Sequence, residues 1–409
     1  MNKNSLYEKS KNFMKIGIDC LELKPNLAGG QLTYILGLLN GFCSVRSENV
    51  SFVIFCTREN KKIFEPISSK YNIELILVGG YFKTLRAVFI MVPLILNSRF
   101  LWRVALNIYA KIFGINKVIV NNCDILYVCT TTLNTYNLSV PTVLSMHDIQ
   151  HVHFPDFFSF LRLRVRRLRF YNSALKATKI QASSNFIKED LCSFFPFVNP
   201  DDVIVIEEGV DLNDFGNQVY TDVKTKYSLP NEFIYFPAAL WKHKNHILVL
   251  KALNRIYKKH SLKIPLVLTG SKQSGHHEIF KFITDNKIDY VRYLGQVSWQ
   301  EVVSLHKSAR YLITAVLYAS SSLPIIEAAA SGLPIIASNT PPNVEMSKFL
   351  HLNLFDSNSV DSLEKVLLDC WNNRKNALEI EVNFKNVKRY SWDNVASKFL
   401  DLFKDLYAV

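Results

Sequence analysis

The stretch Thr314–Ser338, TAVLYASSSLPIIEAAASGLPIIAS, constrains the fold of this chain most strongly. It predicts a strand that ends near Thr314, a helix that begins near Pro324, and a second strand over Leu333–Ala337. Gly332 is expected to end the helix, because glycine readily adopts the left-handed conformation found at helix C-termini. A strand–turn–helix–strand unit of this kind is typical of α/β proteins with parallel sheets.

The turn between this strand and helix has an open backbone, because Ala319–Leu323 carries no bulky side chain before Leu323. Such a turn at a helix N-terminus predicts an anion site, since free N–H groups and the helix dipole both point toward it. Glu327, in the first helical turn, is placed to accept a hydrogen bond from a sugar hydroxyl. The alternative is an ordinary strand–helix connection with a solvated Glu327.

The amino-acid composition limits the classes of protein to which this chain can belong. A chain of 409 residues exceeds the usual size of one hydrophobic core, so two domains are expected, and a hydrophobic content of 49% argues against disorder. The formal net charge of +13 favours an anionic partner, which is a nucleic acid, a phosphorylated metabolite or an acidic membrane face. The seven cysteines are scattered and include no C-x-x-C pair, which indicates buried thiols in a reducing compartment.

Polar, irregular stretches suggest the domain boundaries. Residues 1–13 are polar and predict a flexible extension rather than a secretory signal. Alternating strands and helices predict one α/β domain over residues 14–215 and a second over 231–390, joined by a linker at 216–230. Residues 391–409 predict an amphipathic helix that packs back on the first domain.

Two places in the first domain carry glycine or polar residues beyond a predicted strand. Gly29 and Gly30 form a turn that opens a helix, where the backbone can approach a phosphate closely, although a plain β–α turn would look the same. His147 and Asp148 follow the buried strand Val143–Ser145. Ligands of parallel sheets gather beyond the carboxyl ends of the strands, so these two residues are candidates for a binding site.

Two interpretations of this histidine-rich stretch remain open. In the first, four side chains bind a metal: His147, Asp148, His151 and His153. Their spacing matches no helical or zinc pattern. In the second, His147 lines a polar sugar site and Asp148 orients it.

Two further segments combine cations with large apolar side chains. Tyr81–Phe113 carries five basic residues among aromatic ones and predicts an amphipathic pair of helices, which fits a membrane surface or a lipid-linked substrate. A helix hairpin packed on the domain core is the alternative. Leu161–Phe170 places three arginines on one helix face, namely Arg162, Arg166 and Arg169. This face is either solvated or attracts acidic lipid or a pyrophosphate-linked acceptor.

In the second domain, cations and glycines follow predicted strands. Lys242 and Lys244 lie beside a helix start and predict a clamp for a diphosphate, although lysines are common at helix ends. Gly270 and Gly295 come directly after their strands.

Together these motifs make the chain resemble the GT-B glycosyltransferases, and among them the retaining family 4 that uses nucleotide-sugar donors. The resemblance covers about residues 14–407 and lies in the order and spacing of motifs across two similar halves. The motifs are Gly29-Gly30, His147-Asp148, Gly209-Val210-Asp211, Lys244-Asn245, Gly295, and the block from Leu323-Pro324 through Glu327-Ala328 to Gly332–Ser338. The segments HDIQHVHFP, KHKNH and NTPPNVE are similar to members that build bacterial surface polysaccharides.

This resemblance implies two Rossmann-like, doubly wound domains that face an inter-domain cleft, with the donor held by the second domain and the acceptor by the first. His147 would contact the donor sugar, Lys244 would hold the diphosphate, and Glu327 would bind the ribose; Asp148 completes the implied catalytic set. The residues assigned to donor binding are Gly29, Gly30, Gly209, Lys242, Asn245, Gly270, Gly295, Ser320, Ser321, Ser322 and Leu323.

The implied activity is transfer of a hexose or deoxyhexose, with retention, to a glycan or undecaprenyl-linked glycan in surface polysaccharide or O-antigen biosynthesis. The nucleotide sugar is a co-substrate, and no cofactor or metal is implied, because lysines and helix dipoles stabilise the departing diphosphate. The enzyme is expected in the cytoplasm, peripheral on the inner face of the cytoplasmic membrane, and no nucleic-acid partner is implied.

Two positions depart from the family pattern. Ala319 stands where the family usually carries an acidic residue, eight positions before Glu327, and Ala239 stands where an arginine is common. Either Lys242 and the serines substitute, the donor sugar is unusual (deoxy, for instance), or the site is weakened. Other functions therefore stay open: a non-catalytic GT-B subunit that binds a sugar or a partner transferase, a nucleotide-sugar epimerase, and, from charge alone, a protein that binds nucleic acid with steep salt dependence.

Overall fold

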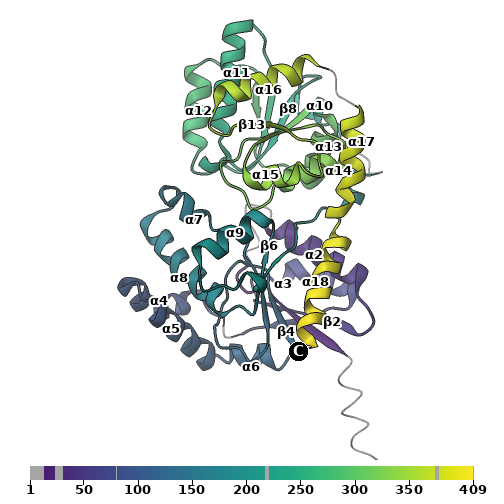
Figure 1. Cartoon of the computed structure of the whole chain (residues 1–409). Helices are drawn as coiled ribbons and strands as arrows, with labels where there is room; N and C mark the ends of the chain where they lie inside the picture. The colour runs from purple at the N-terminus through teal and green to yellow at the C-terminus, as the bar shows by residue number, and fades with distance from the viewer. Residues whose placement is uncertain (1–12, 24–30, 80, 217–220, 374–376, 409) are drawn as a thin grey trace, which may run out of the picture. The chain divides into compact units, whose positions relative to one another are not determined.

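The computed structural model forms two compact units, one from the chain up to Glu207 with the C-terminal stretch from Trp392, the other from Glu208–Ser391 (Figure 1). The residues described are 13–23, 31–79, 81–216, 221–373 and 377–408. The predicted extension lies outside them except for Phe13, and the Gly29-Gly30 turn lies wholly outside them.

The first unit contains a seven-stranded parallel sheet with strand order β3-β2-β1-β4-β5-β6-β7. The strands are β1 (Met14–Asp19), β2 (Val50–Cys56), β3 (Glu74–Leu77), β4 (Ile125–Val128), β5 (Thr142–Ser145), β6 (Lys179–Ala182) and β7 (Val203–Val205). The helices are α2 (Gln31–Val45), α3 (Lys61–Tyr71), α4 (Lys83–Leu96), α5 (Arg99–Ile112), α6 (Ile115–Val120), α7 (Gln150–His153), α8 (Phe160–Lys176), α9 (Asn185–Phe194) and α18 (Trp392–Tyr407), with the 3₁₀ turns η1 (Pro155–Phe157) and η2 (Pro200–Asp202).

Helices cover both faces of this sheet, which explains why its central strands are apolar along nearly their whole length. In Figure 1, α2 and α18 lie on one side of the sheet and α4, α5 and α8 on the other. The C-terminal helix packs against α2 because Gly37 and Gly41 leave room for it. A Cβ at Gly37 would collide with the ring of Trp392, and one at Gly41 would lie 2.5 Å from the Trp392 carbonyl oxygen.

The second unit contains a six-stranded parallel sheet with strand order β10-β9-β8-β11-β12-β13. The strands are β8 (Ile234–Pro237), β9 (Leu266–Thr269), β10 (Val291–Tyr293), β11 (Tyr311–Thr314), β12 (Ile335–Ser338) and β13 (Asn353–Phe355). The helices are α10 (Val223–Tyr227), α11 (His246–His260), α12 (His276–Asp285), α13 (Trp299–Ser308), α14 (Leu323–Ala330), α15 (Pro341–Met346), α16 (Val360–Asn372) and α17 (Ala377–Asn386), with η3 (Leu212–Phe215), η4 (Lys242–Lys244) and η5 (Val387–Tyr390).

The boundary between the units differs from the prediction. The division falls after Glu207, and the described residues 221–230 of the segment placed in a linker at 216–230 contribute to the second unit. Within it, Val223 is fully buried and Leu229 is buried beside it in the core that also holds Phe215. The stretch is polar overall, so these two apolar anchors are easily missed in the sequence.

Each sheet has one point where the strand order reverses. In the first sheet β2 and β3 lie on one side of β1 and β4 to β7 on the other; in the second, β9 and β10 lie on one side of β8 and β11 to β13 on the other. Loops that leave neighbouring strands in opposite directions open a crevice at the carboxyl edge, where ligands bind. The switch points therefore lie between β1 and β4 and between β8 and β11. The cleft between two facing domains stays a prediction.

Candidate functional site

The loops at the switch point of the second unit hold most of the predicted donor-binding residues. Lys242 and Lys244 lie in η4, which follows β8, and the Ser320–Leu323 turn follows β11 and leads into α14. A hydrogen bond joins the two loops, because the N–H of Leu317 donates to the carbonyl oxygen of His243 at 2.9 Å. The fold thus brings together two segments that are far apart in the sequence.

The N-terminus of α14 offers a row of backbone donors. Among the described residues, the N–H groups of Ser321, Ser322 and Leu323 find no hydrogen-bond acceptor. The hydroxyl of Ser322 does not cap the helix, since it donates to Oδ1 of Asn343 at 2.9 Å. Pro324 follows in the first turn and has no N–H to satisfy. Adjacent free donors at a helix N-terminus are suited to a phosphate or a sugar oxygen.

Glycines shape the neighbouring part of this edge. Gly270 follows β9, and its N–H donates to the carbonyl oxygen of Gly295, which lies beyond β10, at 2.7 Å. Gly270 has a φ of 125°, and a Cβ there would lie 2.6 Å from backbone atoms of Ala238 and Ala239. Only glycine allows this close approach, so Gly270 supports the loop after β8 whether or not it touches a ligand.

Positive charge in the loop after β8 comes from the lysines and not from the histidines beside them. Burial, and then the charge of Lys244, lowers the pKa of both His243 and His246 to about 3, so both rings are neutral near pH 7. Lys242 is exposed at the surface. Asn245 adopts a left-handed φ of 59°, and its Nδ2 donates to a backbone carbonyl in the loop after β13 at 3.0 Å. It holds the start of α11 in place.

Glu327 lies on α14 and is 9% exposed, so the alternative of a solvated carboxylate is wrong. Burial, and then the negative charge of Asp214, raises its pKa from 4.5 to about 7. Its Oε2 lies 3.8 Å from Nε2 of His306, whose Nδ1 donates to the carbonyl oxygen of Val302 at 2.9 Å. Although this distance would suit an ion pair, burial lowers the pKa of His306 to about 4, so the imidazole is neutral near pH 7. Glu327 therefore has no cationic partner in His306, and its carboxyl changes protonation state near neutral pH.

His147 and Asp148 follow β5 in the first unit. The ring of His147 packs edge-to-face on Tyr34, with ring centroids 4.8 Å apart. Oδ1 of Asp148 accepts from Nη2 of Arg166 at 3.1 Å and from the N–H of Gln150 at 3.2 Å. The role of Asp148 in orienting His147 stays a prediction.

The metal interpretation of the histidine-rich stretch is wrong. His151 is fully buried with its ring against Phe170, and burial lowers its pKa to about 3. His153 points instead to Asp190, with its Nε2 2.8 Å from the carboxylate oxygens. Across the part of the chain that the structure describes, no three His, Cys, Asp or Glu side chains are placed to hold a metal ion.

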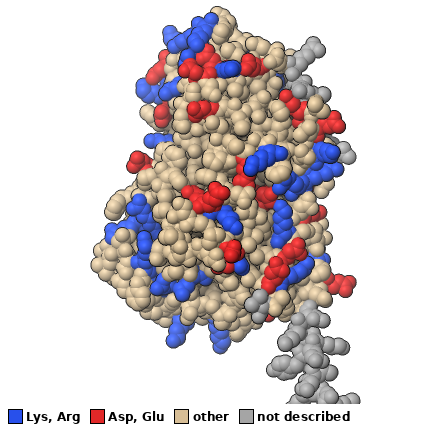
Figure 2. All heavy atoms as spheres, viewed as in Figure 1, with Lys and Arg blue, Asp and Glu red and all other residues tan. Residues whose placement is uncertain are grey.

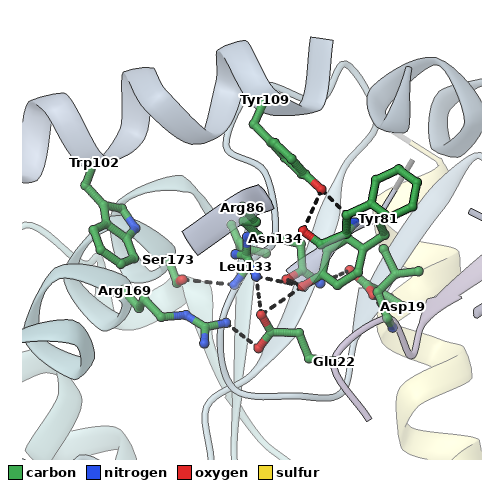
Figure 3. A network of polar contacts seen from close by, with 12 residues as sticks. Asp19, Glu22, Tyr81, Arg86, Trp102, Tyr109, Leu133, Asn134, Arg169 and Ser173 are labelled. Carbon is green, nitrogen blue, oxygen red and sulfur yellow. Dashed lines mark hydrogen bonds and ion pairs between the residues drawn. The ribbon is translucent and has the colours of Figure 1, made fainter. Parts of the chain in front are cut away.

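The switch point of the first unit holds a partly buried network of charged side chains (Figure 3). Glu22, just after β1, forms ion pairs with Arg86 of α4 and Arg169 of α8. Asp19, at the end of β1, accepts from Nδ2 of Asn134 at 2.9 Å, in the loop after β4. The network therefore ties two surface helices to the edge of the sheet where ligands are expected.

The two carboxyl groups of this network differ in their surroundings. Burial alone would raise the pKa of Glu22, but the charges of Arg169 and Arg86 outweigh it and hold the pKa well below its usual range. Asp19 has no such close cation, and burial raises its pKa to about 6. At neutral pH, the single carboxylate of Glu22 faces two guanidinium groups, so both arginines are paired within the chain.

This network corrects one prediction about the basic helix face. Arg169 pairs with Glu22, and Arg166 pairs with Asp148, so two of the three arginines on that face point to internal partners. Arg162 alone of the three is exposed.

Three functional candidates emerge only from the structure: Asp214, His306 and Glu22. They lie next to predicted residues in space but not in sequence, and no local pattern marks them. Gly209 belongs to the segment that enters the second unit, where the N–H of Val210 donates to the carbonyl oxygen of Tyr390 at 2.8 Å. This segment continues to Asp214, whose charge acts on Glu327.

Residues 222–387, which make up most of the second unit, match the family of glycosyl transferases group 1. The second unit of this chain is therefore similar to the group 1 glycosyl transferases. It is 25% identical over 346 residues to the O-antigen chain mannosyltransferase RfbU of Salmonella typhimurium, covering 84% of this chain and 87% of the relative. It is 23% identical over 272 residues to the O-antigen chain mannosyltransferase B of Escherichia coli, covering 64% and 70%.

The fold of these glycosyltransferases is also found in solved structures. Anabaena Alr3699/HepE, in complex with UDP and glucose, matches 96% of this chain and 100% of its own with a TM-score of 0.68 at 16% identity. This likeness concerns the fold: two Rossmann-like parallel sheets in the GT-B arrangement of elements. The predicted fold class is thereby confirmed.

Proposed function

We propose that this glycosyltransferase moves a hexose or deoxyhexose from a nucleotide sugar to a glycan or undecaprenyl-linked glycan, with retention of configuration, in bacterial surface polysaccharide synthesis. Its place of action is the cytoplasm, on the inner face of the membrane. Support comes from the two relatives named as O-antigen mannosyltransferases and from a fold shared with a protein that binds UDP and glucose.

The main support for this proposal is that two loops meet at the switch point of the second unit. Free N–H groups of Ser321, Ser322 and Leu323 lie across from the lysine-bearing loop after β8. In the proposed complex these donors and Lys244 receive the diphosphate, and Glu327 accepts from the ribose.

This arrangement suits the chemistry of transfer. As the bond between the sugar and the phosphate breaks, negative charge grows on the departing diphosphate. Fixed cations and backbone dipoles stabilise that charge more in the transition state than in the bound donor, which lowers the barrier. His147 of the first unit is assigned to the donor sugar near the reacting carbon.

A second candidate function is a weakened GT-B subunit that binds a sugar or a partner transferase. Ala319 favours it, because the turn after β11 then contains no carboxylate to hold a sugar hydroxyl. Ala239 favours it as well, because it leaves the loop after β8 one cation short of the family pattern.

Thermal-shift screening of the full chain against UDP, GDP, dTDP and CMP tests the proposal first, since a ligand that binds only the folded state raises the melting temperature. Release of free nucleotide from the matching nucleotide sugars, with and without lipid-linked acceptor, tests turnover. Acceptor-dependent release supports transfer. A nucleotide shift with no release from any donor supports the weakened subunit, and release of free sugar without an acceptor contradicts transfer.

A further inference from the structure

The outer face of α4 carries an apolar stripe that no other part of the described chain covers. Leu85, Val88, Val92 and Ile95 recur at spacings of three and four residues, which places them on one side of the helix. All four are exposed, Val92 at 60% and Ile95 at 67%. Residues of α5 such as Trp102 are buried, so the hairpin packs on the unit through α5 and presents α4 outward.

The stripe continues onto the neighbouring helices. At one end, Nη2 of Arg164 donates to the carbonyl oxygen of Ile95 at 2.7 Å, which brings the first turn of α8 to the end of α4. That turn exposes Phe160 at 77%. At the other end, Phe82 and Phe113 approach to 6.0 Å between ring centroids and join the start of α4 to the end of α5. Apolar groups thus extend over three helices, more than the scattered single residues expected on an ordinary surface.

Cations outnumber acids at this surface, where Glu59 pairs with Lys83 at the start of α4. The sequence contains no Asp or Glu between Glu74 and Asp124, a stretch that includes both helices of the hairpin, and none between Asp156 and Glu189, which includes α8. Figure 2 shows blue and tan over the region of α4, α5 and α8, with no red among them in this view. Within the described residues, no acidic side chain pairs with Lys111 of α5 or Arg162 of α8.

We propose that α4, the outer face of α5 and the first turn of α8 dock in the plane of an anionic lipid bilayer. Exposed apolar side chains enter the boundary between headgroups and acyl chains, and the surrounding lysines and arginines contact anionic headgroups. No helix in the described part of the chain is long and apolar enough to cross a membrane, and α4, with 14 residues, suits a position in the surface instead. A partner protein that received this surface in a groove would be expected to place acidic side chains opposite specific cations. Binding to a bilayer needs only the apolar stripe and diffuse positive charge.

This docking has a consequence for catalysis that rests on the proposed function. Arg86 of α4 and Arg169 of α8 both hold Glu22 at the switch point of the first unit. The docked helices are therefore fixed to the edge where an acceptor would bind, and a lipid-linked acceptor is presented there from the bilayer.

Flotation of the full chain with vesicles tests the docking without any need for activity. The vesicles contain phosphatidylcholine alone or with 30 mol% phosphatidylglycerol, and the two variants compared are Val92→Glu/Ile95→Glu and Leu378→Glu/Phe384→Glu. The second pair lies on α17 of the other unit and is exposed to a similar degree, 65% and 56%, so it adds the same charge to a similar surface. The α4 pair is expected to lower partitioning at least about tenfold, because two immersed apolar side chains are lost. The α17 pair is expected to leave partitioning unchanged.

The contribution of charge is tested separately. Replacing Lys111 and Arg162 by Gln is expected to reduce partitioning to the anionic vesicles by about fivefold per cation and to leave partitioning to the neutral ones unchanged. Nucleotide-induced thermal shifts of each variant check that the second unit is intact. Three outcomes would overturn the proposal. The first is an equal loss of partitioning in both Glu variants, and the second is vesicle binding that does not depend on anionic lipid. The third is self-association of the chain that only the α4 variant abolishes. Vesicle binding without glycosyl transfer would uphold docking and count against the proposed function alone.

Discussion

Replacing Glu327 by Gln should stabilise the protein at pH 8 much more than at pH 5. The carboxyl group is buried without a cation, and its pKa is about 7 in the folded chain against 4.5 for an ordinary glutamate. The unfolded chain therefore releases this proton at lower pH than the folded chain does. As a result, the folded state is penalised progressively as the pH rises from about 4.5 to about 7, and the penalty is complete above pH 7.

The size of the effect follows from the two pKa values. The shift of 7 − 4.5 = 2.5 units corresponds to about 3.4 kcal/mol when fully expressed, at 1.36 kcal/mol per unit. Linkage gives a penalty of about 0.8 kcal/mol at pH 5 and about 3.3 kcal/mol at pH 8. Glutamine has nearly the same shape and no charge to desolvate, so the variant should gain about 2.5 kcal/mol over the native chain between these two pH values.

Thermal and urea unfolding of both proteins at pH 5 and pH 8 measures this difference. Glu301→Gln in the same unit is the matched control. Hydrogen bonds from Lys226, Tyr227 and Ser298 lower the pKa of Glu301 to about 2, so its charge is stabilising at both pH values and its loss should destabilise equally at each. A gain for the Glu327 variant that is the same at pH 5 and pH 8, or larger at pH 5, would refute the assignment of a buried, uncompensated carboxyl group.

Three further outcomes are expected. Lys244→Ala should reduce turnover by about a hundredfold in a nucleotide-release assay, because a cation at the developing phosphate charge is lost; full activity would remove Lys244 from its role. Gly270→Ala should lower stability by about 1–3 kcal/mol in urea unfolding, since its φ of 125° and the 2.6 Å approach of the backbone at Ala238 both exclude a Cβ. Glu22→Gln should cost about 2–3 kcal/mol at pH 7, because Arg86 and Arg169 lose their counter-charge. The folded pKa of Glu22 lies below its ordinary value, so this loss should fade as the pH falls below about 4.5, which thermal unfolding at pH 7 and pH 3 would show.

The features that the sequence predicts well are those that depend only on neighbouring residues. The open turn before Pro324, the helix that ends by Gly332, and the strand after it all follow from local propensity, and the structure has them as α14 and β12. Gly270, which follows β9, is visible in the sequence too, but the sequence does not show why a glycine is required there. The close backbone of Ala238 that requires Gly270 comes from a different strand connection.

The features that the sequence misses depend on distant partners. Arg86 and Arg169 look like solvent-facing cations in their own helices, and their direction is decided by Glu22, which is 64 and 147 residues away. Likewise, Glu327 looks like an ordinary helix-start acid, and only the packing of His306 from α13 shows that it is enclosed. Side-chain direction at a switch point is therefore a tertiary property, which a helical or strand pattern does not contain.

The missing acid at position 319 can be understood from the same turn. Ala319 is buried, and beyond it Oγ of Ser321 is also buried with no hydrogen-bond partner among the described residues. A buried hydroxyl without a partner is costly unless a ligand satisfies it, so this turn retains a polar contact for a sugar although it lacks a carboxylate. If this site binds the proposed donor, the turn offers a sugar hydroxyl neutral N–H and O–H donors and no carboxylate. Under the proposed function, this favours a donor with fewer hydroxyls, such as a deoxyhexose.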